Sequence, residues 1–383
     1  MLYLSEKNQP QNALFWLTLR RKKTNMNYNI SGIQQIGIGN TNVHKTWAWY
    51  RSFFGVDVPI FEEAATAALM LPYTGNQPQA RHAVLAIHTQ GGGGLEIWQY
   101  TQRTPQPCSF EVKVGDLGIF AAKFPCKNAE TMYTKLKEKG AKLLGEISKN
   151  PAGERHFYLQ DLENNIIEVT ETPHRQWFTN KNLPNAGPIG ATIGVSNIEK
   201  SLELYTNILG YDQVVYDLTD TFGDFKPLNG GGGKYRRVLL RHAQARKGPF
   251  SQMFGASEIE LVQCLDAVPR KIFANRFWGD CGYIHLCFDI QNMAALKEIC
   301  AQKGFNFTVD SSLAHRTGFD MGEAAGHFSY IEDPDGTLIE FVETHKIPIL
   351  KKFGWYLDLR KRNPAHALPK LMLMALALNR KKD

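Results

Sequence analysis

Four glutamates stand at matching places in this sequence, each in a short apolar stretch that is typical of a β-strand. They are Glu96 in LEIWQY, Glu168 in IIEVTE, Glu260 in IELVQC and Glu340 in TLIEFVE. A carboxylate among apolar neighbours needs a partner, because an unpaired buried charge is very costly. A metal ion or a basic side chain must therefore neutralise each of these groups.

One histidine, His285 in YIHLCFD, lies in a similar strand-like stretch. Because side chains alternate between the two faces of a strand, His285 shares its face with Cys287 and Asp289. By the same rule, Glu340 shares its face with Val342. A lone histidine on a strand is weak evidence of a site. The weight of His285 comes from its place in the repeats described below.

A salt bridge is the alternative to a metal ion for these glutamates. The strand-like stretch YRRVLLRHA offers several basic side chains that could neutralise a buried carboxylate. They are Arg236, Arg237, Arg241 and His242. The sequence leaves both the metal and the salt bridge open.

The six cysteines form no CxxC pair and no regular disulfide framework. This pattern is typical of a reducing compartment, and we predict a cytoplasmic protein. Cys281 and Cys287 flank His285, which raises the alternative of a zinc site. We favour the simpler interpretation, in which both cysteines are small buried hydrophobes on a strand.

Internal repeats organise the body of the chain. IQQIGIGNTNVHKTWAWYRSFFG at 33–55 resembles PIGATIGVSNIEKSLELYTNILG at 188–210, with a strand, a turn containing Asn and an amphipathic helix that ends at Gly. Each unit is itself double, since similar openings recur at 118–140 and 282–304. Four modules of a strand, a helix and further strands predict an α+β fold rather than a doubly wound sheet.

The repeats and the composition divide the chain into five regions. The Pro, Asn and Gly of PHRQWFTNKNLPNAG indicate a linker between two domains of two neighbouring modules each. We predict an N-terminal extension at 1–28, a first domain at 29–172, a linker at 173–187, a second domain at 188–344 and a basic tail at 345–383.

The positive charge of the chain lies at its two ends. The 383 residues carry a formal net charge of +7. Residues 345–383 hold ten Lys or Arg against two Asp, a net +8, and residues 1–28 carry +4, which leaves −5 for the body. A mildly acidic body gives no reason to expect nucleic-acid binding. Residues 1–28 lack the pattern of a secretory signal. Since Met26 precedes the first repeat, we predict an extension that is either non-native or disordered.

The basic tail contains an apolar helix candidate at Leu368–Leu378. This stretch is too short to span a bilayer. We favour packing on the body. The alternatives are peripheral contact with an anionic membrane surface and packing on a partner chain, such as the second copy in a homodimer.

Two stretches, DPDGTLIEF at 333–341 and IGVSNIEKSLELY at 193–205, resemble the vicinal oxygen chelate superfamily. This superfamily includes glyoxalase I, bleomycin resistance proteins and extradiol ring-cleaving dioxygenases, and the resemblance covers about residues 30–344. It implies βαβββ modules paired into half-open barrels, each around a cleft. It also implies metal ligands on the first and last strand of each module, with His or Gln first and Glu last.

Carried over residue by residue, the resemblance gives one ligand set to each domain. The first is Gln35, Glu96, Ala121 and Glu168, and the second is Gly190, Glu260, His285 and Glu340. Ala121 and Gly190 offer no ligand atom, but the second set keeps one imidazole and two carboxylates. We therefore predict a metal site of Glu260, His285 and Glu340 for a divalent Zn, Fe, Mn, Ni or Co ion.

A metal site with open positions would polarise a pair of substrate oxygens and stabilise an enolate or oxyanion. The resemblance to glyoxalase I implies that Glu260 or Glu340 moves a proton as the catalytic base. We predict a metal-dependent, glyoxalase-like lyase or isomerase for a small oxygen-bearing substrate, with its cleft in the second domain. The alternatives are a non-catalytic binding or resistance protein and a ring-cleaving dioxygenase, which Gly190 at a His position disfavours.

Overall fold

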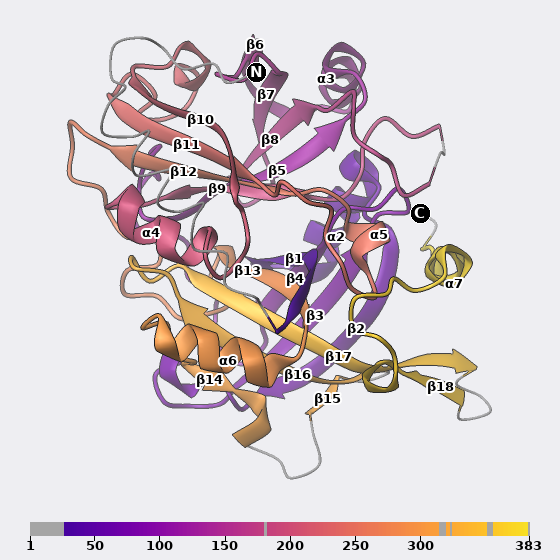
Figure 1. Cartoon of the computed structure of the whole chain (residues 1–383). Helices are drawn as coiled ribbons and strands as arrows, with labels where there is room; N and C mark the ends of the chain where they lie inside the picture. The colour runs from indigo at the N-terminus through magenta and orange to yellow at the C-terminus, as the bar shows by residue number, and fades with distance from the viewer. Residues whose placement is uncertain (1–26, 180–181, 314–318, 322–323, 351–354, 382–383) are drawn as a thin grey trace.

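The computed structural model describes residues 27–179, 182–313, 319–321, 324–350 and 355–381. The predicted start at Met26 and nearly all of the N-terminal extension lie outside the described residues. The body consists of two curled β-sheets with helices packed on them (Figure 1). Among the described residues, the helices are too short or too polar to cross a bilayer.

The four predicted modules are all present, each with a strand, a helix and three or more further strands. The first comprises β1 (Asn29–Gly39), α2 (Val43–Phe54), β2 (Val58–Ala67), β3 (Gln79–Ile87) and β4 (Gly94–Tyr100), and the second comprises β5 (Gly118–Cys126), α3 (Ala129–Glu138), β6 (Lys142–Lys149), β7 (Arg155–Gln160) and β8 (Ile166–Glu171). The third comprises β9 (Gly190–Gly194), α4 (Ile198–Tyr205), β10 (Gln213–Asp220), β11 (Tyr235–Arg241) and β12 (Glu258–Cys264), and the fourth comprises β13 (Gly282–Gln291), α6 (Met293–Gln302), β14 (Val309–Asp310), β15 (Phe319–Met321), β16 (Ala324–Glu332) and β17 (Leu338–Leu350).

The first helix of every module starts at an asparagine cap. In each case the side-chain oxygen accepts a hydrogen bond from the backbone N–H three residues further on, which satisfies one of the free donors at the helix start. The four caps are Asn42, Asn128, Asn197 and Asn292. This shared cap is the local signal that makes the four modules fold alike.

The modules pair into two sheets, and the α+β fold of two half-open barrels is confirmed. Sheet A has the strand order β14-β16-β17-β13-β1-β4-β3-β2, with β15 beside β16 and a further strand beside β17; sheet B has the order β10-β11-β12-β9-β5-β8-β7-β6. Sheet A therefore joins the first module to the fourth through β1 and β13, and sheet B joins the second to the third through β5 and β9.

This pairing corrects the sequence-based division of the chain. The repeats predict that neighbouring modules pair within 29–172 and 188–344, but the two sheets combine outer with outer and inner with inner modules. Residues 173–187, predicted as a linker between domains, instead join β8 to β9 inside sheet B. The reason is that all four modules share the same apolar pattern, so a module can pair equally well with a neighbouring or a distant module, as in a domain swap.

Two connections run between the sheets and are joined to each other by hydrogen bonds. Residues 101–117 lead from β4 to β5, and residues 265–281 lead back from β12 to β13. The N–H of Leu117 donates to the carbonyl of Arg270 at 2.8 Å, and the N–H of Ile272 donates to the carbonyl of Leu117 at 2.9 Å. The side chain of Arg103 also pairs with the buried Asp280 at 2.5 Å.

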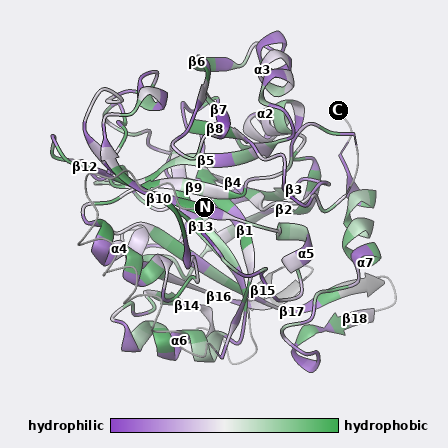
Figure 2. Ribbon diagram, turned by 45° about the horizontal axis from the view of Figure 1, so that its top comes forward, coloured by the Kyte–Doolittle hydropathy of each residue, from purple (hydrophilic) through white to green (hydrophobic). Residues whose placement is uncertain are grey.

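Neighbouring modules still touch through their helices and turns. The hydroxyl of Tyr50 in α2 donates to Asp161 at 2.8 Å, in the turn between β7 and β8. The equivalent Tyr205 in α4 donates to Asp333 at 3.1 Å, in the turn between β16 and β17. One buried apolar cluster spans both sheets, and Figure 2 shows apolar residues along the strands. The two half-barrels therefore share a core, which favours a single cooperative unit.

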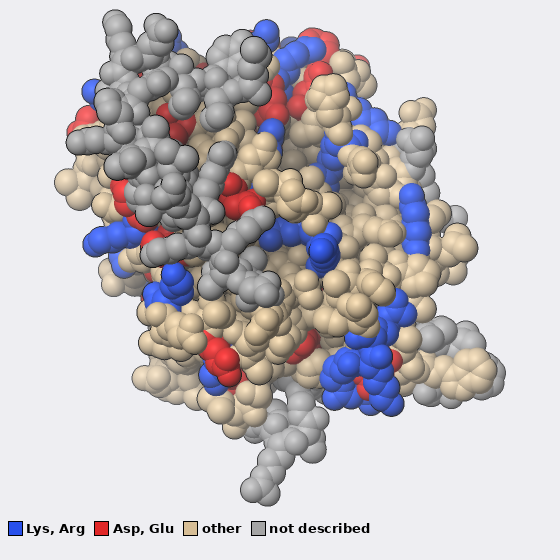
Figure 3. Space-filling model, viewed as in Figure 1, with Lys and Arg blue, Asp and Glu red and all other residues tan. Residues whose placement is uncertain are grey.

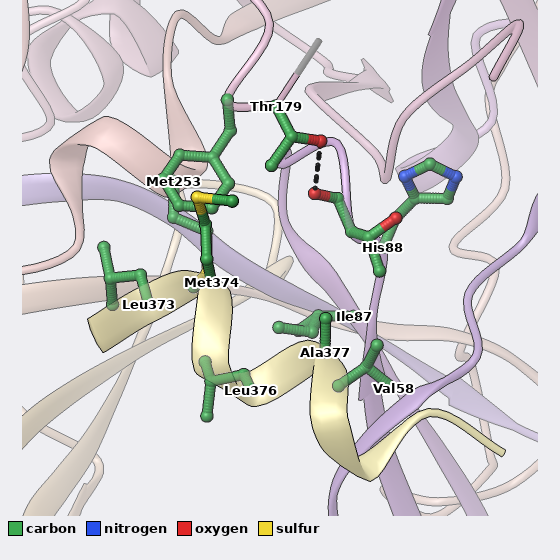
Figure 4. Close-up of a pocket in the computed structure, with 11 residues that line it drawn as sticks. Val58, Ile87, His88, Thr179, Met253, Leu373, Met374, Leu376 and Ala377 are labelled. Atoms are coloured by element: carbon green, nitrogen blue, oxygen red, sulfur yellow. Dashed lines mark hydrogen bonds between the residues drawn. The ribbon is translucent and has the colours of Figure 1, made fainter. Parts of the chain in front are cut away.

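The C-terminal segment packs on the body. It contains β18 (Trp355–Asp358), which pairs with β17, then the short helices α7 (Lys370–Ala375) and η6 (Leu376–Asn379). Leu368 and Leu373 are buried with Met253 in a satellite cluster. A small cavity of about 30 Å³ lies between these helices and the edge of sheet A (Figure 4). Contact with a membrane and homodimerisation stay predictions.

Candidate metal centre

Four adjacent strands at the middle of sheet A each place one polar side chain on the same face. In the order β17, β13, β1 and β4, these are Glu340, His285, Gln35 and Glu96. The strand registers explain this alignment. Gly37 of β1 lies opposite His285 on one neighbouring strand and opposite Glu96 on the other. Cys287 of β13 lies opposite Gln35 on one side and opposite Glu340 on the other. The four side chains come from the first and last strands of the two outer modules.

The polar groups of these four residues converge. Nε2 of His285 lies 3.1 Å from Oε2 of Glu340 and 3.3 Å from Oε2 of Glu96. The amide nitrogen of Gln35 donates to Oε2 of Glu340 at 3.3 Å. One ligand atom each from Glu96, His285 and Glu340 falls within 4.8 Å of the others, close enough to share a single cation.

Gly37 makes room for the imidazole at the centre of this group. A Cβ atom at this position would overlap the ring of His285. Gly37 has an ordinary extended backbone, so its role is close approach rather than an unusual conformation. The glycine therefore lets the imidazole lie against β1, between the carboxylates supplied by β4 and β17.

The two carboxylate charges beside the buried imidazole favour a bound cation. His285 is fully buried, while the side chains of Glu96 and Glu340 are 13% and 9% exposed. Burial on its own would lower the pKa of His285, but Glu340 and Glu96 raise it to about 9. Without a metal, the imidazole thus keeps a proton that offsets one of the two carboxylate charges.

Unsatisfied polar atoms at this place fit a divalent metal. Neither ring nitrogen of His285 makes a well-aligned hydrogen bond within the described part of the chain, and Oε1 of Gln35 also lacks a partner there. Buried polar atoms are normally paired. One imidazole, two carboxylates and one amide oxygen form a donor set that suits a borderline divalent ion such as Zn²⁺.

Aromatic rings cover the imidazole on the side of the connection 265–281. The indole of Trp278 lies parallel to the ring of His285, with centroids 6.2 Å apart, and Tyr330 meets that ring edge-on at 5.6 Å. Trp98 packs against Trp278 at 4.6 Å. The Nε1–H of Trp278 is buried and has no acceptor among the described residues, so a donor stays available beside the site.

Glu260 does not join His285 and Glu340, which corrects the predicted ligand set. It lies on β12 in sheet B, where its Oε1 accepts from Nε of Arg237 at 2.7 Å and its Oε2 accepts from Nζ of Lys123 at 3.0 Å. The physical reason is the pairing of the modules, because the third module shares a sheet with the second. For Glu260, the alternative of an arginine salt bridge is therefore correct.

Lys123 fills the place in sheet B that corresponds to the candidate metal position. In the register of β5 and β8, Lys123 lies opposite Glu168. This is the position that Cys287 holds opposite Glu340 in the register of β13 and β17. Nζ of Lys123 lies 2.8 Å from Oε2 of Glu168 as well as 3.0 Å from Glu260. The fully buried ammonium thus bridges two carboxylates that a metal would otherwise hold.

Further charges complete the network in sheet B. The guanidinium of Arg237 also pairs with Asp224 at 2.7 Å, and Nδ1 of His156 lies 2.8 Å from Glu168. Burial alone would raise the pKa of both glutamates, but Lys123 and His156 hold the pKa of Glu168 well below the ordinary range, and Arg237 and Lys123 do the same for Glu260. These carboxylates stay ionised in a paired, structural setting.

Residues 189–341 match the family model for the glyoxalase/bleomycin resistance protein/dioxygenase superfamily. These residues belong to that superfamily. The resemblance predicted from the sequence is therefore confirmed, and the same module recurs in residues 29–171. No curated protein matches the sequence.

Solved structures of the superfamily show the same fold across most of the chain. A mutant of glyoxalase I from Zea mays aligns with a TM-score of 0.53 and 12% identity, over 86% of this chain and 96% of that one. A putative dioxygenase from Bacillus subtilis aligns with a TM-score of 0.53 and 13% identity, over 82% of this chain and 86% of that one. At these identities the likeness concerns the fold alone.

The superfamily pattern contained a signal that sequence reasoning missed. Ala121 and Gly190, the two positions without a ligand, both lie in inner modules, and both outer modules are complete. If the two outer modules are grouped, all four ligand positions carry a side chain with a ligand atom, and Gln35 and Glu96 join His285 and Glu340. The unusual Lys123, buried on a strand two residues after Ala121, was a second indication that the inner pair is neutralised by the protein itself.

Proposed function

We propose that sheet A holds a divalent transition metal on Gln35, Glu96, His285 and Glu340. We further propose that the chain is a glyoxalase-like lyase or isomerase. The observation that supports this most directly is the convergence of one imidazole and two carboxylates within 4.8 Å, in a described group that includes no Lys or Arg. The substrate class would be small molecules with two neighbouring oxygens, such as 1,2-dicarbonyl compounds.

The residues present suit the chemistry of proton movement beside such an oxygen pair. When bound, the cation would polarise the substrate oxygens and stabilise an enolate or oxyanion. Glu340 and Glu96 are the groups that can take a proton from carbon and return it to the neighbouring atom. Gln35 holds Glu340 in place through its amide, and the free N–H of Trp278 can donate to a substrate oxygen.

The location of the site changes from the sequence-based expectation. Glu340 keeps its proposed role as a base, and Glu96 replaces Glu260 in the set. A ring-cleaving dioxygenase is less well supported, because the set offers one imidazole, and the His position at Gly190 lies in the other sheet. A non-catalytic binding protein is the competing outcome of the experiment below.

Metal content and turnover test the proposal together. We expect purified protein to hold about one equivalent of a transition metal at this centre, and to isomerise a 1,2-dicarbonyl compound or its thiol adduct. His285→Ala and Glu96→Gln should lower both the metal held at this centre and turnover at least about tenfold, because the first removes a ligand and the second replaces a charged ligand by a weaker neutral amide. Metal analysis by mass spectrometry and an absorbance assay would measure the two effects.

Glu168→Gln in sheet B is the matched control, since it changes an equivalent glutamate that Lys123 already neutralises. It should leave metal content and turnover unchanged. If Glu168→Gln removed the metal and Glu96→Gln did not, our assignment would be reversed. Metal binding without turnover on any dicarbonyl would favour a binding protein.

A further inference from the structure

A second group of metal-ligating side chains lies at the edge of sheet A, away from the centre described above. It consists of His44 in the first turn of α2, Glu62 on β2 and His82 on β3. One ligand atom from each residue falls within 4.8 Å of the others. These three residues, called here the edge cluster, have no part in the proposed function.

The three side chains meet because two strands and one helix converge on one side of the sheet. His82 pairs with Ala64 across β2 and β3, so it shares a face with Glu62, two residues before Ala64. The helix α2 packs on the same part of the sheet and brings His44 over it. The rings of His44 and His82 lie 5.0 Å apart and nearly perpendicular, at 70°.

One carboxylate oxygen faces both imidazoles. Oε1 of Glu62 lies 3.3 Å from Nδ1 of His44 and 3.8 Å from Nε2 of His82. The other oxygen, Oε2, lies 3.8 Å from Nζ of Lys381 at the end of the C-terminal segment. Glu62 can therefore offer Oε1 to a cation while Lys381 holds its other oxygen.

His82 carries the observation that points to a ligand. Its Nε2 is shielded from solvent and makes no hydrogen bond within the described residues. A buried imidazole nitrogen without a partner is uncommon, because burial without a hydrogen bond is costly. The side chain is 26% exposed and that of His44 is 63% exposed, so the cluster opens to solvent from the side of the helix.

We propose that the edge cluster is a second divalent metal site, of the class that takes Zn²⁺, Cu²⁺ or Ni²⁺. Two imidazoles and one carboxylate are preferred ligands of these ions, and water completes the coordination on the exposed side. The bound ion ties α2 to β2 and β3. Because the site is open to solvent, its metal exchanges faster than one held at the buried His285.

The edge cluster can be tested on the full chain with Zn²⁺ and Cu²⁺ as probes. After removal of metal with a chelator and gel filtration, we expect the protein to take up one more equivalent of Zn²⁺ than His82→Ala or Glu62→Gln. His44→Ala should weaken this second equivalent at least about tenfold. With Cu²⁺ loaded at this site, electron paramagnetic resonance should show coupling to imidazole nitrogen that disappears in His82→Ala.

Two variants serve as matched controls. Glu63→Gln changes the next residue of β2, whose carboxylate pairs with Arg81 rather than with the histidines, and His366→Ala removes an exposed histidine of the C-terminal segment. Both should bind as much metal as the unaltered chain. Equal uptake by the unaltered chain and by His82→Ala would overturn the proposal and leave a plain histidine–glutamate ion pair.

The outcome does not depend on the proposed function. If sheet A binds no metal at His285, the unaltered chain takes up one equivalent and His82→Ala takes up none. If the edge cluster alone fails, the unaltered chain and His82→Ala both take up one equivalent, and His285→Ala takes up none. Each failure thus has its own pattern.

Discussion

Two pairs of glutamates occupy equivalent places in the two sheets, and different charges surround them. In sheet B, the ammonium of Lys123 lies between Glu168 and Glu260. In sheet A, an imidazole lies between Glu96 and Glu340. A fixed ammonium leaves no place for a cation, whereas an imidazole can give up its proton and become a ligand. The side chain between the glutamates thus decides which sheet can do metal chemistry.

Removing the ammonium of Lys123 should destabilise the protein strongly. Lys123→Met leaves Glu168 and Glu260 buried without the cation that bridges them, and breaking a buried ion pair in this way costs about 3–5 kcal/mol. Unfolding in urea would measure the loss. Lys137→Met, on the exposed side of α3, is the control and should change stability by less than about 0.5 kcal/mol. Similar stability of the two variants would contradict the structural role of Lys123.

Asp289 gives a pH dependence that can be measured apart from the metal. This carboxyl group of β13 is fully buried beside the hydroxyl of Ser31, neither of its oxygens makes a well-aligned hydrogen bond in the described structure, and burial raises its pKa from 3.8 to about 8. Between these two values the unfolded chain releases the proton and the folded chain keeps it. The stability that comes from this difference is therefore full below pH 4 and is lost as the pH rises toward 8.

Asp289→Asn cannot ionise, so it should escape that loss. We expect the variant to gain stability over the unaltered protein as the pH rises from 5 to 8, by up to a few kcal/mol. Thermal unfolding of both proteins at pH 5 and pH 8 would measure the difference. A gain that is the same at both pH values would show that Asp289 is not protonated in the folded chain.

At the scale of the elements, local sequence signals predict the modules but not the partner with which each module pairs. The asparagine caps, the amphipathic helices and the glycine ends are local, so they predict each module by itself. Which module lies beside β1 is decided by backbone pairing with β13, and either neighbour would satisfy the same apolar pattern. For this reason the sequence predicts that His285 and Glu340 share a module, but it does not predict that Glu96 lies beside them.

Gly37 tests whether the register of β1 and β13 positions the imidazole. Gly37→Ala places a methyl group where the ring of His285 lies, so the ring must move away from Glu96 and Glu340. We expect a loss of stability of about 1–3 kcal/mol and weaker metal binding. Gly232→Ala, where a Cβ would meet open space, should leave both unchanged. Chemical unfolding and metal titration are the measurements, and unchanged metal affinity in Gly37→Ala would argue against this geometry.

At the scale of the whole molecule, both candidate sites lie in the half-barrel that is built from the first and fourth modules. Sheet A is built from the two ends of the body and from the C-terminal segment, whose Arg380 pairs with Asp57 at 2.5 Å. Sheet B is built from the uninterrupted stretch between them. On the face shown in Figure 3, Lys and Arg side chains gather near β18, and the helical turn Leu359–Lys361 that follows this strand carries Arg360 and Lys361. The first and fourth modules must therefore pair before the candidate metal centre can form.

This arrangement predicts which fragments of the chain can fold. A fragment of residues 112–272 contains the second and third modules and thus every strand of sheet B, with the buried pairs of Lys123 and Arg237 intact. A fragment of residues 29–172 contains half of each sheet, so β1 and β5 would both lose the antiparallel partner that they have in the whole protein. Unpaired central strands expose backbone donors and acceptors and promote aggregation.

We expect the fragment 112–272 to unfold in one cooperative transition in urea and to bind no transition metal, because its glutamates are already neutralised. It will be less stable than the whole protein, since the apolar cluster shared with sheet A becomes exposed. The fragment 29–172 should aggregate or show no cooperative transition by circular dichroism. Cooperative unfolding of a monomeric 29–172 fragment would mean that neighbouring modules can pair after all. The lengths of the connections between modules would then determine that outer modules pair with outer and inner with inner, rather than any preference of β1 for β13.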